Sequence, residues 1–575
     1  MMQVPLLTNE NINLIFPHGI EMKGVRLTEQ DFNELELNAI IHMIDNNRKH
    51  FNDIRNIFRQ LNYDPETIKY RLDIVEDLLN NSDLLLCLEE SLSIIADMRF
   101  VSGKNSSVSV DMLQTVSRIK ELSIYVDFVQ QLLKAFTDAH LKSAGLIRLK
   151  DRIIQISEDF DFKNLSEQLP ILQKGLDSIS SVTIGINFDA QLNPVEATLI
   201  SINDKKFSGN SLLGKLFASG KEYQGISELY KNPEHMQTVH ISKNDTSTYD
   251  MSPEETELRR ILFRDLKKVL KHVLKPIQPM VERYAYLHFN WILSLETDIA
   301  FYVGAVRFIN KLRDWGMPMC RPTLLPSEER KTHLKGNYNL NLALRLSTRY
   351  EDGKLGDHIV TNDVTFDDQG RIFILTGPNS GGKTTYAQAI GLTQVLMQAG
   401  LYVPCVEAEM SPVDGLYPYF NVEENSSMET GRLGVESKKI GEIFQNATPN
   451  SLILLNESFS STSPGESLYL MKDIVCALKL LGLRAVIATH LHELAESVNE
   501  INTQQAGESK LISMVAGIKE GIDHHLTESN RSYKVTPGKP QGQSFARDIA
   551  RQYGISLKQL TQTIHERNLV TIPSK

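Results

Sequence analysis

The stretch that decides the fold is RIFILTGPNSGGKTT, residues 371–385. An apolar strand runs into a glycine-rich loop of the pattern GxxxxGK[ST], and the loop opens a helix, which is the setting that this motif requires. Backbone N–H groups of such a loop surround a nucleotide β-phosphate. Lys383 would supply a cation to the β- and γ-phosphates, and the Thr384 hydroxyl would bind Mg²⁺. The predicted ATP-binding residues are Gly377, Pro378, Asn379, Ser380, Gly381, Gly382, Lys383, Thr384 and Thr385.

Two later strand ends complete the predicted nucleotide site. The apolar run 452–455 leads to Asn456 and Glu457, where hydrolases of this class carry an acidic pair. Glu457 is placed to orient and deprotonate a water, whereas Asn456 offers an amide oxygen to Mg²⁺ in place of a carboxylate. The run 484–488 leads to His490, which can sense the γ-phosphate by a hydrogen bond. We expect ATP hydrolysis to ADP and phosphate, slowed by the missing charge at Asn456.

The wider sequence changes its pattern along the chain. Residues from about 30 to 180 predict successive helices, one of them starting at Asp64-Pro65 with an N-cap and a first-turn proline. Alternation over 182–202 predicts a β-hairpin. Beyond about residue 335, strands and helices alternate, as in α/β nucleotide-binding domains. The expected strands are 339–346, 371–375, 452–455, 484–488 and 511–515, and the expected helices are 384–399, 438–446, 467–482, 544–553 and 556–564.

Composition limits the class of protein. A chain of 575 residues is too long for one core, and its 41% hydrophobic and 23% charged residues are ordinary for globular domains. A net charge of -10 means that any nucleic-acid contact must be local. Four scattered cysteines favour neither a disulfide framework nor a zinc site and fit a reducing cytoplasm. The sequence has no visible signal peptide and no apolar run of about 18 residues, so we expect a cytoplasmic protein without a membrane segment.

One expected helix carries an unusual concentration of positive charge. Residues 259–275 place seven cations and one acidic residue on the face opposite an apolar stripe. Such a face is usually only solvated, and contact with DNA phosphates is the alternative. The candidate DNA-binding residues are Arg260, Arg264, Lys267, Lys268 and Lys271.

Taken together, these motifs resemble the DNA mismatch repair MutS family. The likeness is dense from about residue 355 to 495 and continues more faintly back to about residue 50. The segments that carry it are GPNSGGKTT at 377–385, Leu401-Tyr402-Val403-Pro404, Asn446-Ala447-Thr448, ATHLHEL at 488–494, RLDIVE at 71–76, and the pair Thr462-Ser463, which is similar to the family's D-loop.

The resemblance implies an α/β C-terminal ABC-type P-loop ATPase domain, preceded by a mostly helical lever and clamp domain with a small β-hairpin. It also implies a homodimer, formed through the ATPase domain and a C-terminal helix-turn-helix, in which each active site is completed by the other subunit. The expected regions are an N-terminal segment at 1–50, a lever at 51–325 with a reduced clamp around 182–250, the ATPase domain at 335–530, and a C-terminal dimerisation segment at 531–575.

Three departures from the family pattern qualify these expectations. Helices of the lever type begin by about residue 50, which leaves no room for a mismatch-reading domain; Phe32-Asn33-Glu34 fits the family's wedge tripeptide, but we interpret it as a coincidence within a helix. The family's Ser-Thr pair in the signature loop is replaced by Gly431 and Arg432. Arg432 could reach a γ-phosphate in trans or be a solvated loop residue. Asn456 stands in place of an aspartate.

The expected function is that of a dimeric ATP-driven clamp or switch on double-stranded DNA, in repair or recombination, with further repair proteins as partners. Without a mismatch reader, branched or damaged DNA is the expected target. Two alternatives stay open: a ribosome- or RNA-associated quality-control ATPase, and a structural dimer that binds nucleotide with little hydrolysis. A transporter ATPase is disfavoured by the long helical region that precedes the nucleotide motifs.

Overall fold

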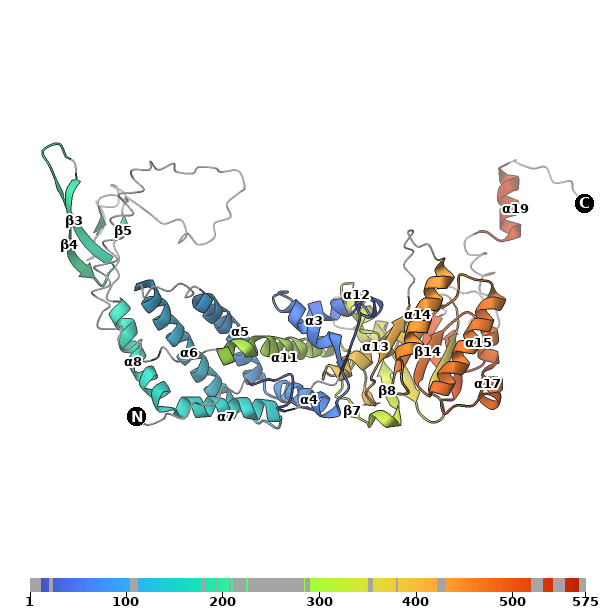
Figure 1. The fold of residues 1–575 in the computed structure, drawn as a ribbon. Helices are drawn as coiled ribbons and strands as arrows, with labels where there is room; N and C mark the ends of the chain where they lie inside the picture. Colours follow the sequence, from blue (N-terminus) through green and yellow to red (C-terminus); the bar gives the residue numbers. More distant parts are fainter. Residues whose placement is uncertain are drawn as a thin grey trace, which may run out of the picture. The chain divides into compact units, whose positions relative to one another are not determined.

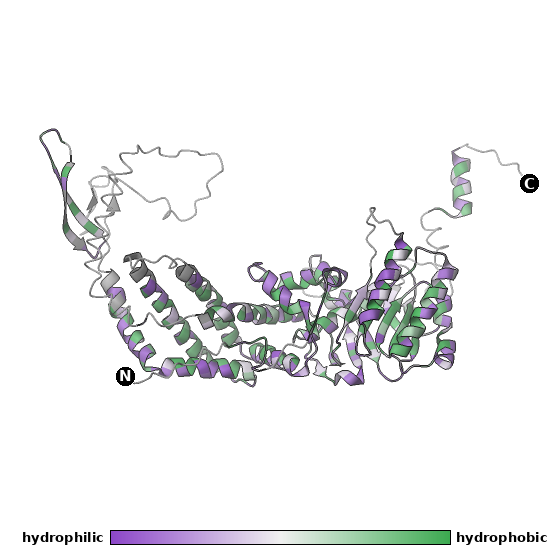
Figure 2. Ribbon diagram, in the orientation of Figure 1, coloured by the Kyte–Doolittle hydropathy of each residue, from purple (hydrophilic) through white to green (hydrophobic). Residues whose placement is uncertain are grey.

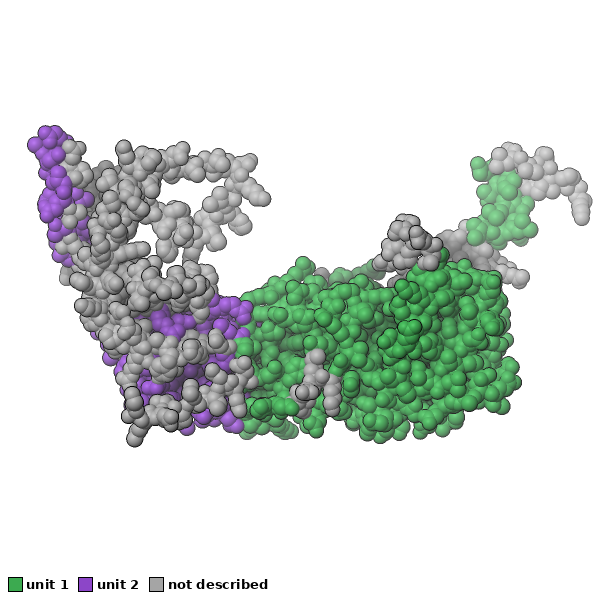
Figure 3. Space-filling view, in the orientation of Figure 1, with its two compact units in different colours: residues 1–89, 139–148, 294–575 green, residues 90–138, 149–293 purple. Residues whose placement is uncertain are grey.

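The computed structural model describes most of the chain and divides it into two compact units. Unit 1 comprises residues 1–89, 139–148 and 294–575, and unit 2 comprises residues 90–138 and 149–293 (Figure 3). The boundary between the two units falls inside the region 51–325, which we expected to be one lever. The domain limits expected from the sequence remain a prediction. The described residues are 12–19, 24–103, 112–177, 181–192, 194–205, 208–209, 224–225, 284, 290–349, 355–378, 381–420, 431–518, 531–540 and 554–567.

A six-stranded sheet forms the centre of the C-terminal part of unit 1 (Figure 1). Its order is β12-β13-β14-β10-β15-β16; the first five strands are parallel and β16 is an antiparallel edge strand. The carboxyl ends of β10, β13 and β14 therefore lie at one edge, where open α/β sheets bind ligands. In sheet order, the strands are Leu416–Tyr419, Leu452–Asn456, Arg484–Ala488, Ile372–Thr376, Leu511–Ile518 and Arg531–Pro537.

Helices cover both faces of this sheet, which explains the continuous apolar runs of its central strands. Ile453 and Leu455 share a buried core with the helices α14 to α17, whereas Leu454 faces Gly391 of α13 on the opposite side. Figure 2 shows the strands as mostly hydrophobic and the outer helices as mixed. The helices are α13 (Lys383–Gln398), α14 (Arg432–Asn446), α15 (Pro464–Leu481), α16 (His492–Glu496) and α17 (Val498–Gln504).

The predicted strand at 339–346 is wrong, because Leu340–Ser347 forms helix α12. Apolar residues at every second position suggested a strand, but Asn339 caps the helix by accepting a hydrogen bond from the Leu342 N–H at 2.9 Å. The neighbouring residues form a four-stranded sheet of order β7-β11-β8-β9 that we did not anticipate. Its strands are Thr323–Leu324, Glu407–Met410, Thr332–Asn337 and Asn362–Phe366, with the short helices η3 (Ser327–Glu329) and η4 (Leu355–His358) nearby in sequence.

The N-terminal helices pack on the nucleotide-motif region rather than only leading into the lever. The Glu34 carboxylate accepts the Phe420 N–H at 2.8 Å, and the carbonyls of Glu34 and Leu35 accept hydrogen bonds from Gln388 and Asn341. Residues 12–16 belong to the same unit. The elements are β1 (Gly24–Arg26), α1 (Glu29–Glu34), α2 (Leu37–Ile44), α3 (Phe51–Arg59) and β2 (Gln60–Asn62), and the helix at 29–34 confirms that Phe32-Asn33-Glu34 is helical.

Long helices make up most of the remaining described chain, as predicted. Asp64 caps α4 through the Thr67 N–H, with Pro65 in its first turn. Within unit 2, Tyr125 of α6 packs edge-on against Phe162 of α8. These helices are α4 (Pro65–Asn80), α5 (Ser82–Gly103), α6 (Met112–Asp138), α7 (Ala144–Glu158), α8 (Phe160–Asp177), α11 (Asn290–Asp314) and α19 (Leu557–Glu566).

The β-hairpin predicted at 182–202 is confirmed. Strands β3 (Ser181–Phe188) and β4 (Pro194–Asn203) pair antiparallel, with register shifts after Thr183 and Asn187. Two further short strands, β5 (Ser208–Gly209) and β6 (Gln224–Gly225), pair with each other. Among the described helices, none is both long and apolar enough to cross a membrane.

Candidate functional site

Lys383 is the first residue of α13, directly after the loop that follows β10, at the carboxyl edge of the six-stranded sheet. Its side chain is buried, and Nζ donates hydrogen bonds of 3.1 Å to the carbonyls of Gly377 and Pro378. Burial lowers the pKa of Lys383, and the nearby Glu457 carboxylate acts in the opposite direction. An anion placed in the loop would supply the counter-charge that this buried ammonium lacks.

The metal-ligand candidates meet across the same edge. The Thr384 Oγ1 donates a hydrogen bond to the Asn456 Oδ1 at 3.0 Å, joining the start of α13 to the end of β13. Mg²⁺ accepts such neutral oxygen ligands together with phosphates and waters. The two oxygens therefore fit a magnesium ion, although neither brings a charge. No cluster of three acidic, histidine or cysteine side chains that could hold a metal occurs in the described parts of the chain.

Glu457 and His490 are brought together by neighbouring strands. His490 Nε2 lies 2.8 Å from Glu457 Oε1, and both side chains are less than half exposed. The hydrogen bond from His490 is the main cause that lowers the pKa of Glu457. Glu457 is therefore ionised over the whole neutral range and able to accept a proton from water.

A cavity of 470 Å³ opens beside the loop and contains residues from distant parts of the sequence. Lys383, Thr384 and Glu457 are among its lining residues. Residues that we did not predict complete the wall, and they come from the four-stranded sheet, the segment between β8 and α12, α12, η4, α13 and β16. Among them are Tyr338, Asn339, Leu342, His358, Asn362, Tyr386 and Tyr533.

Tyr533 reaches this cavity because β16 is tied to β9. The Asn362 amide donates to the Tyr533 carbonyl at 3.1 Å and accepts the Val535 N–H at 2.8 Å. The Tyr533 ring lies against Gly382, where an added Cβ would be 3.4 Å from it. No local motif marks this tyrosine, since its position depends on pairing between segments about 170 residues apart.

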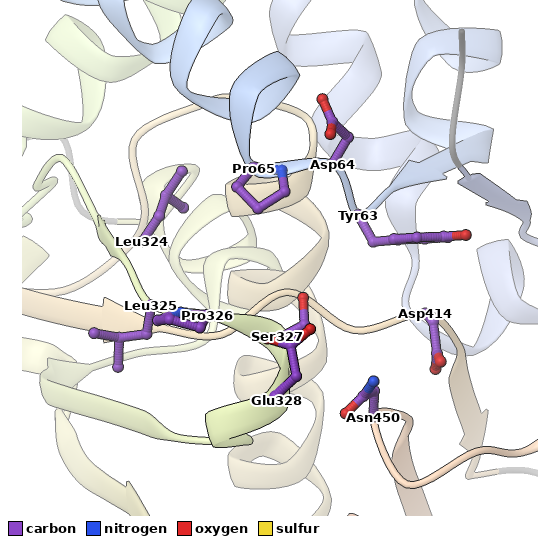
Figure 4. Close-up of a pocket in the computed structure, with 10 residues that line it drawn as sticks. All are labelled: Tyr63, Asp64, Pro65, Leu324, Leu325, Pro326, Ser327, Glu328, Asp414 and Asn450. Atoms are coloured by element: carbon purple, nitrogen blue, oxygen red, sulfur yellow. The ribbon is translucent and has the colours of Figure 1, made fainter. Parts of the chain in front are cut away.

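A second cavity, of 560 Å³, shares no lining residue with the first, and Figure 4 shows the residues that line it. Asp414 and Asn450 precede β12 and β13, which places them toward the amino edge of the sheet. Among the described residues, the carboxylates of Asp64, Glu328 and Asp414 line it, and no lysine or arginine does. A triphosphate would be repelled there, so the cavity beside Lys383 is the nucleotide candidate.

The residues expected to act on a partner subunit all have partners within this chain. Arg432 pairs with Glu436 at 3.1 Å, and its side chain is 41% exposed. Gly431 is the N-cap of α14. Thr462 and Ser463 both donate to Glu466, and Ser463 forms a capping box that starts α15.

Several predicted residues lie outside the part of the chain that the structure describes. They are Asn379 and Ser380 of the loop, the first predicted C-terminal helix at 544–553, and the whole basic helix at 259–275 with Arg260, Arg264, Lys267, Lys268 and Lys271.

Two family models match the chain in adjoining parts. The model described as MutS domain V matches residues 373–562, which include the loop, Glu457 and His490. The model described as MutS2 N-terminal domain matches residues 63–315, which include helices α4 to α8 and α11.

Three similar proteins are all named DNA mismatch repair proteins. The DNA mismatch repair protein MutS of Caldicellulosiruptor saccharolyticus is 24% identical over 504 residues, or 84% of this chain and 55% of that protein. MutS of Clostridium tetani is 25% identical over 78% of this chain and 50% of its own length. The DNA mismatch repair protein MSH2 of Saccharomyces cerevisiae is 32% identical over 41% of this chain and 23% of its own length. The chain thus spans about half the length of the MutS proteins it matches, and it belongs to the MutS family.

Proposed function

We propose that the protein is a MutS-type ATPase that hydrolyses ATP to ADP and phosphate and uses the nucleotide as a switch. The C-terminal part would be an ABC-type P-loop domain, and the helices of residues 51–325 would be a lever with a reduced clamp. The observation that carries the proposal is the convergence of Lys383, Thr384, Asn456, Glu457 and His490 at one edge of the sheet.

In this proposal, the loop and Lys383 bind the phosphates, and Glu457 accepts a proton from the attacking water. His490 orients the Glu457 carboxylate through their hydrogen bond and senses the γ-phosphate. Thr384 and Asn456 would hold Mg²⁺, which neutralises charge on the phosphates when bound. The lowered pKa of Glu457 keeps the base ionised but also makes it weak, which is a second reason to expect slow turnover.

The cavity supports a position for the nucleobase. His358 and Tyr533 line it together with the apolar side chains of Leu342 and Leu346, and an adenine ring would find both stacking and hydrophobic contact there. We propose that Tyr533 packs over the base, because its ring already borders Gly382 of the phosphate loop.

The DNA-binding and dimeric parts of the proposal rest on the family and on sequence. MutS and MSH2 are named DNA mismatch repair proteins, and we propose repair or recombination on double-stranded, branched or damaged DNA for this chain. The basic face at 259–275 would contact phosphates. A homodimer through the ATPase and C-terminal segments would bring Arg432, Thr462 and Ser463 to the partner's nucleotide.

One observation favours a second candidate. The neutral Thr384–Asn456 contact leaves the metal position without a protein carboxylate, so a nucleotide-binding dimer with very little hydrolysis is the alternative.

A competition panel tests the target. Homoduplex, mismatched and four-way DNA would compete with ribosomes for the purified protein, with and without ATP. We expect four-way DNA to bind most tightly and its affinity to respond to ATP; preferential binding to ribosomes would contradict the DNA proposal. Charge reversal at Lys267, Lys268 and Lys271 should weaken DNA binding and flatten its salt dependence, whereas reversal at the exposed Lys335, Lys510 and Lys539 should not.

A further inference from the structure

Glu436 is a buried carboxylate next to the catalytic edge that neither the sequence motifs nor the proposed reaction uses. It lies on α14 and is only 1% exposed. Its Oε1 accepts a hydrogen bond from Arg432 Nε at 3.1 Å, and its Oε2 accepts the backbone N–H of Phe459. Phe459 is two residues beyond Glu457, so one buried charge joins α14 to the turn that carries the proposed base.

The turn that follows β13 has an unfavourable backbone conformation. Glu457 has a φ of +52° and Phe459 a φ of +60°. Side chains with a Cβ rarely adopt this left-handed region, and they persist there only when surrounding contacts determine the geometry. Contacts with neighbouring residues must therefore stabilise this turn.

The contacts that hold it come from three sides. The Glu457 N–H donates to the Ala488 carbonyl at 2.8 Å. The Ser467 hydroxyl donates to the Phe459 carbonyl at 2.6 Å, and the Phe459 ring is buried in the core. The Glu436 carboxylate binds the Phe459 N–H, and an ionised acceptor makes the stronger kind of hydrogen bond. Without the Glu436 carboxylate, the Phe459 N–H would have lost this hydrogen-bond acceptor next to its own buried ring.

We propose that Glu436 is a positioning residue, which fixes the left-handed turn and thereby aims the Glu457 carboxylate at the water beside the γ-phosphate. The inference rests on the proposed ATPase function and adds a residue to it. Glu436 itself touches no substrate, since it does not line the cavity beside the loop. Its effect should therefore appear in turnover and not in nucleotide binding.

The Arg432 ion pair supports this role from the exposed side. Arg432 is on the first turn of α14, four residues before Glu436, and the pair holds the carboxylate in the orientation that reaches Phe459. Because Arg432 is also our candidate for contact with a partner's nucleotide, movement of this side chain would be transmitted to the base through a single carboxylate.

The test compares three substitutions on α14 in the full-length protein. Glu436→Ala removes both acceptor oxygens, Glu436→Gln keeps an oxygen for the Phe459 N–H without the charge, and Glu442→Ala is a control at an exposed glutamate of the same helix. We expect Glu436→Ala to lower kcat by about 10- to 100-fold, as misplaced catalytic groups do, with the KM for ATP and the binding of a non-hydrolysable ATP analogue nearly unchanged. Glu436→Gln should recover a large part of kcat, and Glu442→Ala should match the wild type.

A second comparison separates positioning from general destabilisation. In a Glu457→Gln background, Glu436→Ala should cause little further loss in single-turnover rate, because its effect passes through Glu457. Unchanged kcat in Glu436→Ala, or a parallel loss of analogue binding in both Glu436 variants, would overturn the inference alone. Wild-type turnover equal to that of Glu457→Gln would instead overturn the proposed function, and the positioning role with it.

Discussion

In the proposed site, Asn456 takes the place of a carboxylate that would contact the metal, and its amide oxygen accepts the Thr384 hydroxyl at 3.0 Å. An aspartate there would add a full negative charge, which at about 4 Å and an effective dielectric of about 20 interacts with a monovalent cation by roughly 4 kcal/mol. Desolvation and screening reduce this figure, but the direction is fixed. We predict that Asn456→Asp lowers the half-saturating Mg²⁺ concentration by about tenfold or more and raises kcat.

A Mg²⁺ titration of the ATPase rate at saturating ATP measures this effect. A conservative control is Asn456→Ser, which keeps a neutral oxygen and should not tighten Mg²⁺ binding. Equal Mg²⁺ dependence in Asn456→Asp and the wild type would contradict the assignment of residue 456 to the metal.

The His490–Glu457 contact predicts a pH effect with a definite sign. The hydrogen bond from His490 lowers the pKa of Glu457, so the ionised base persists at lower pH than an ordinary glutamate. Without the imidazole, partial burial raises the pKa of this carboxyl, and protonation then removes the base at a higher pH. We predict that His490→Ala shifts the acid limb of the kcat profile upward, in addition to lowering the rate at its plateau.

Normalised profiles of kcat against pH for the wild type and for His490→Ala measure this shift. An acid limb that stays in place after His490→Ala would show that the imidazole does not stabilise the ionised form of Glu457 during turnover.

The core residues of the site were predictable from sequence because each one lies within a few residues of a strand end. Lys383, Thr384, Asn456, Glu457 and His490 follow apolar strands in one parallel sheet, so strand order alone brings them near each other. Glu436 was not predictable in this way. Its role depends on the packing of α14 against the Phe459 turn, which no local pattern records.

At the scale of elements, α11 crosses the end of α2 so closely that a single added methyl group tests the packing. A Cβ on Gly304 would lie 2.2 Å from the Ile44 carbonyl oxygen, whereas a Cβ on Gly441 of α14 would meet nothing within 4 Å. Both are helix-interior glycines, for which alanine alone favours the helix by about 0.5–1 kcal/mol.

We predict that Gly441→Ala stabilises the protein by about that amount, while Gly304→Ala destabilises it by about 1–3 kcal/mol, because backbone atoms must shift to admit the methyl group. Urea unfolding of the two variants and the wild type measures the difference. If Gly304→Ala is as stable as Gly441→Ala, the α2–α11 crossing is not packed as closely as described.

Elements with a cap, a continuous apolar run or a long helical period were predicted well, including β10, β13, β14 and α4. Helix α12 was missed because its leucines alternate like those of a strand, and only the contact of Asn339 with the Leu342 N–H reveals the helical start. Strands β8, β9 and β16 were missed because their short sequences carry no continuous apolar run; β8 pairs with β9 and β11, and β16 pairs with β15. The hydrogen bonds of Asn362 with β16 bring Tyr533 to the cavity across a long sequence separation, so the proposed nucleobase side of the site was missed as well.

At the scale of the whole molecule, the proposed dimer has a composite active site, with Glu457 acting within its own subunit and Arg432 acting on the partner's nucleotide. A symmetric dimer makes these two roles separable by mixing. Glu457→Gln and Arg432→Ala subunits would each be nearly inactive alone. In a mixed dimer, one site combines both defects and the other combines neither.

We predict that an equimolar mixture, after subunit exchange, recovers up to about a quarter of the wild-type rate per subunit, because about half of the dimers are mixed and each has one site with both Glu457 and a partner Arg432. Loss of the Arg432–Glu436 pair in the subunit that supplies Glu457 lowers this figure. Mixing Glu457→Gln with the wild type provides the calibration for exchange. No recovery in the mixture would indicate that Arg432 acts only within its own subunit, through its pair with Glu436.

The most direct measurement is steady-state ATP hydrolysis by the purified wild-type protein and by Glu457→Gln, with ATP binding measured for both. We predict that the wild type turns over ATP, and that the variant is slower by about 10²- to 10⁴-fold, the range expected for loss of a general base, while it still binds ATP with similar affinity. Wild-type turnover no faster than that of Glu457→Gln, with ATP bound equally by both, would contradict the ATPase and leave a nucleotide-binding dimer.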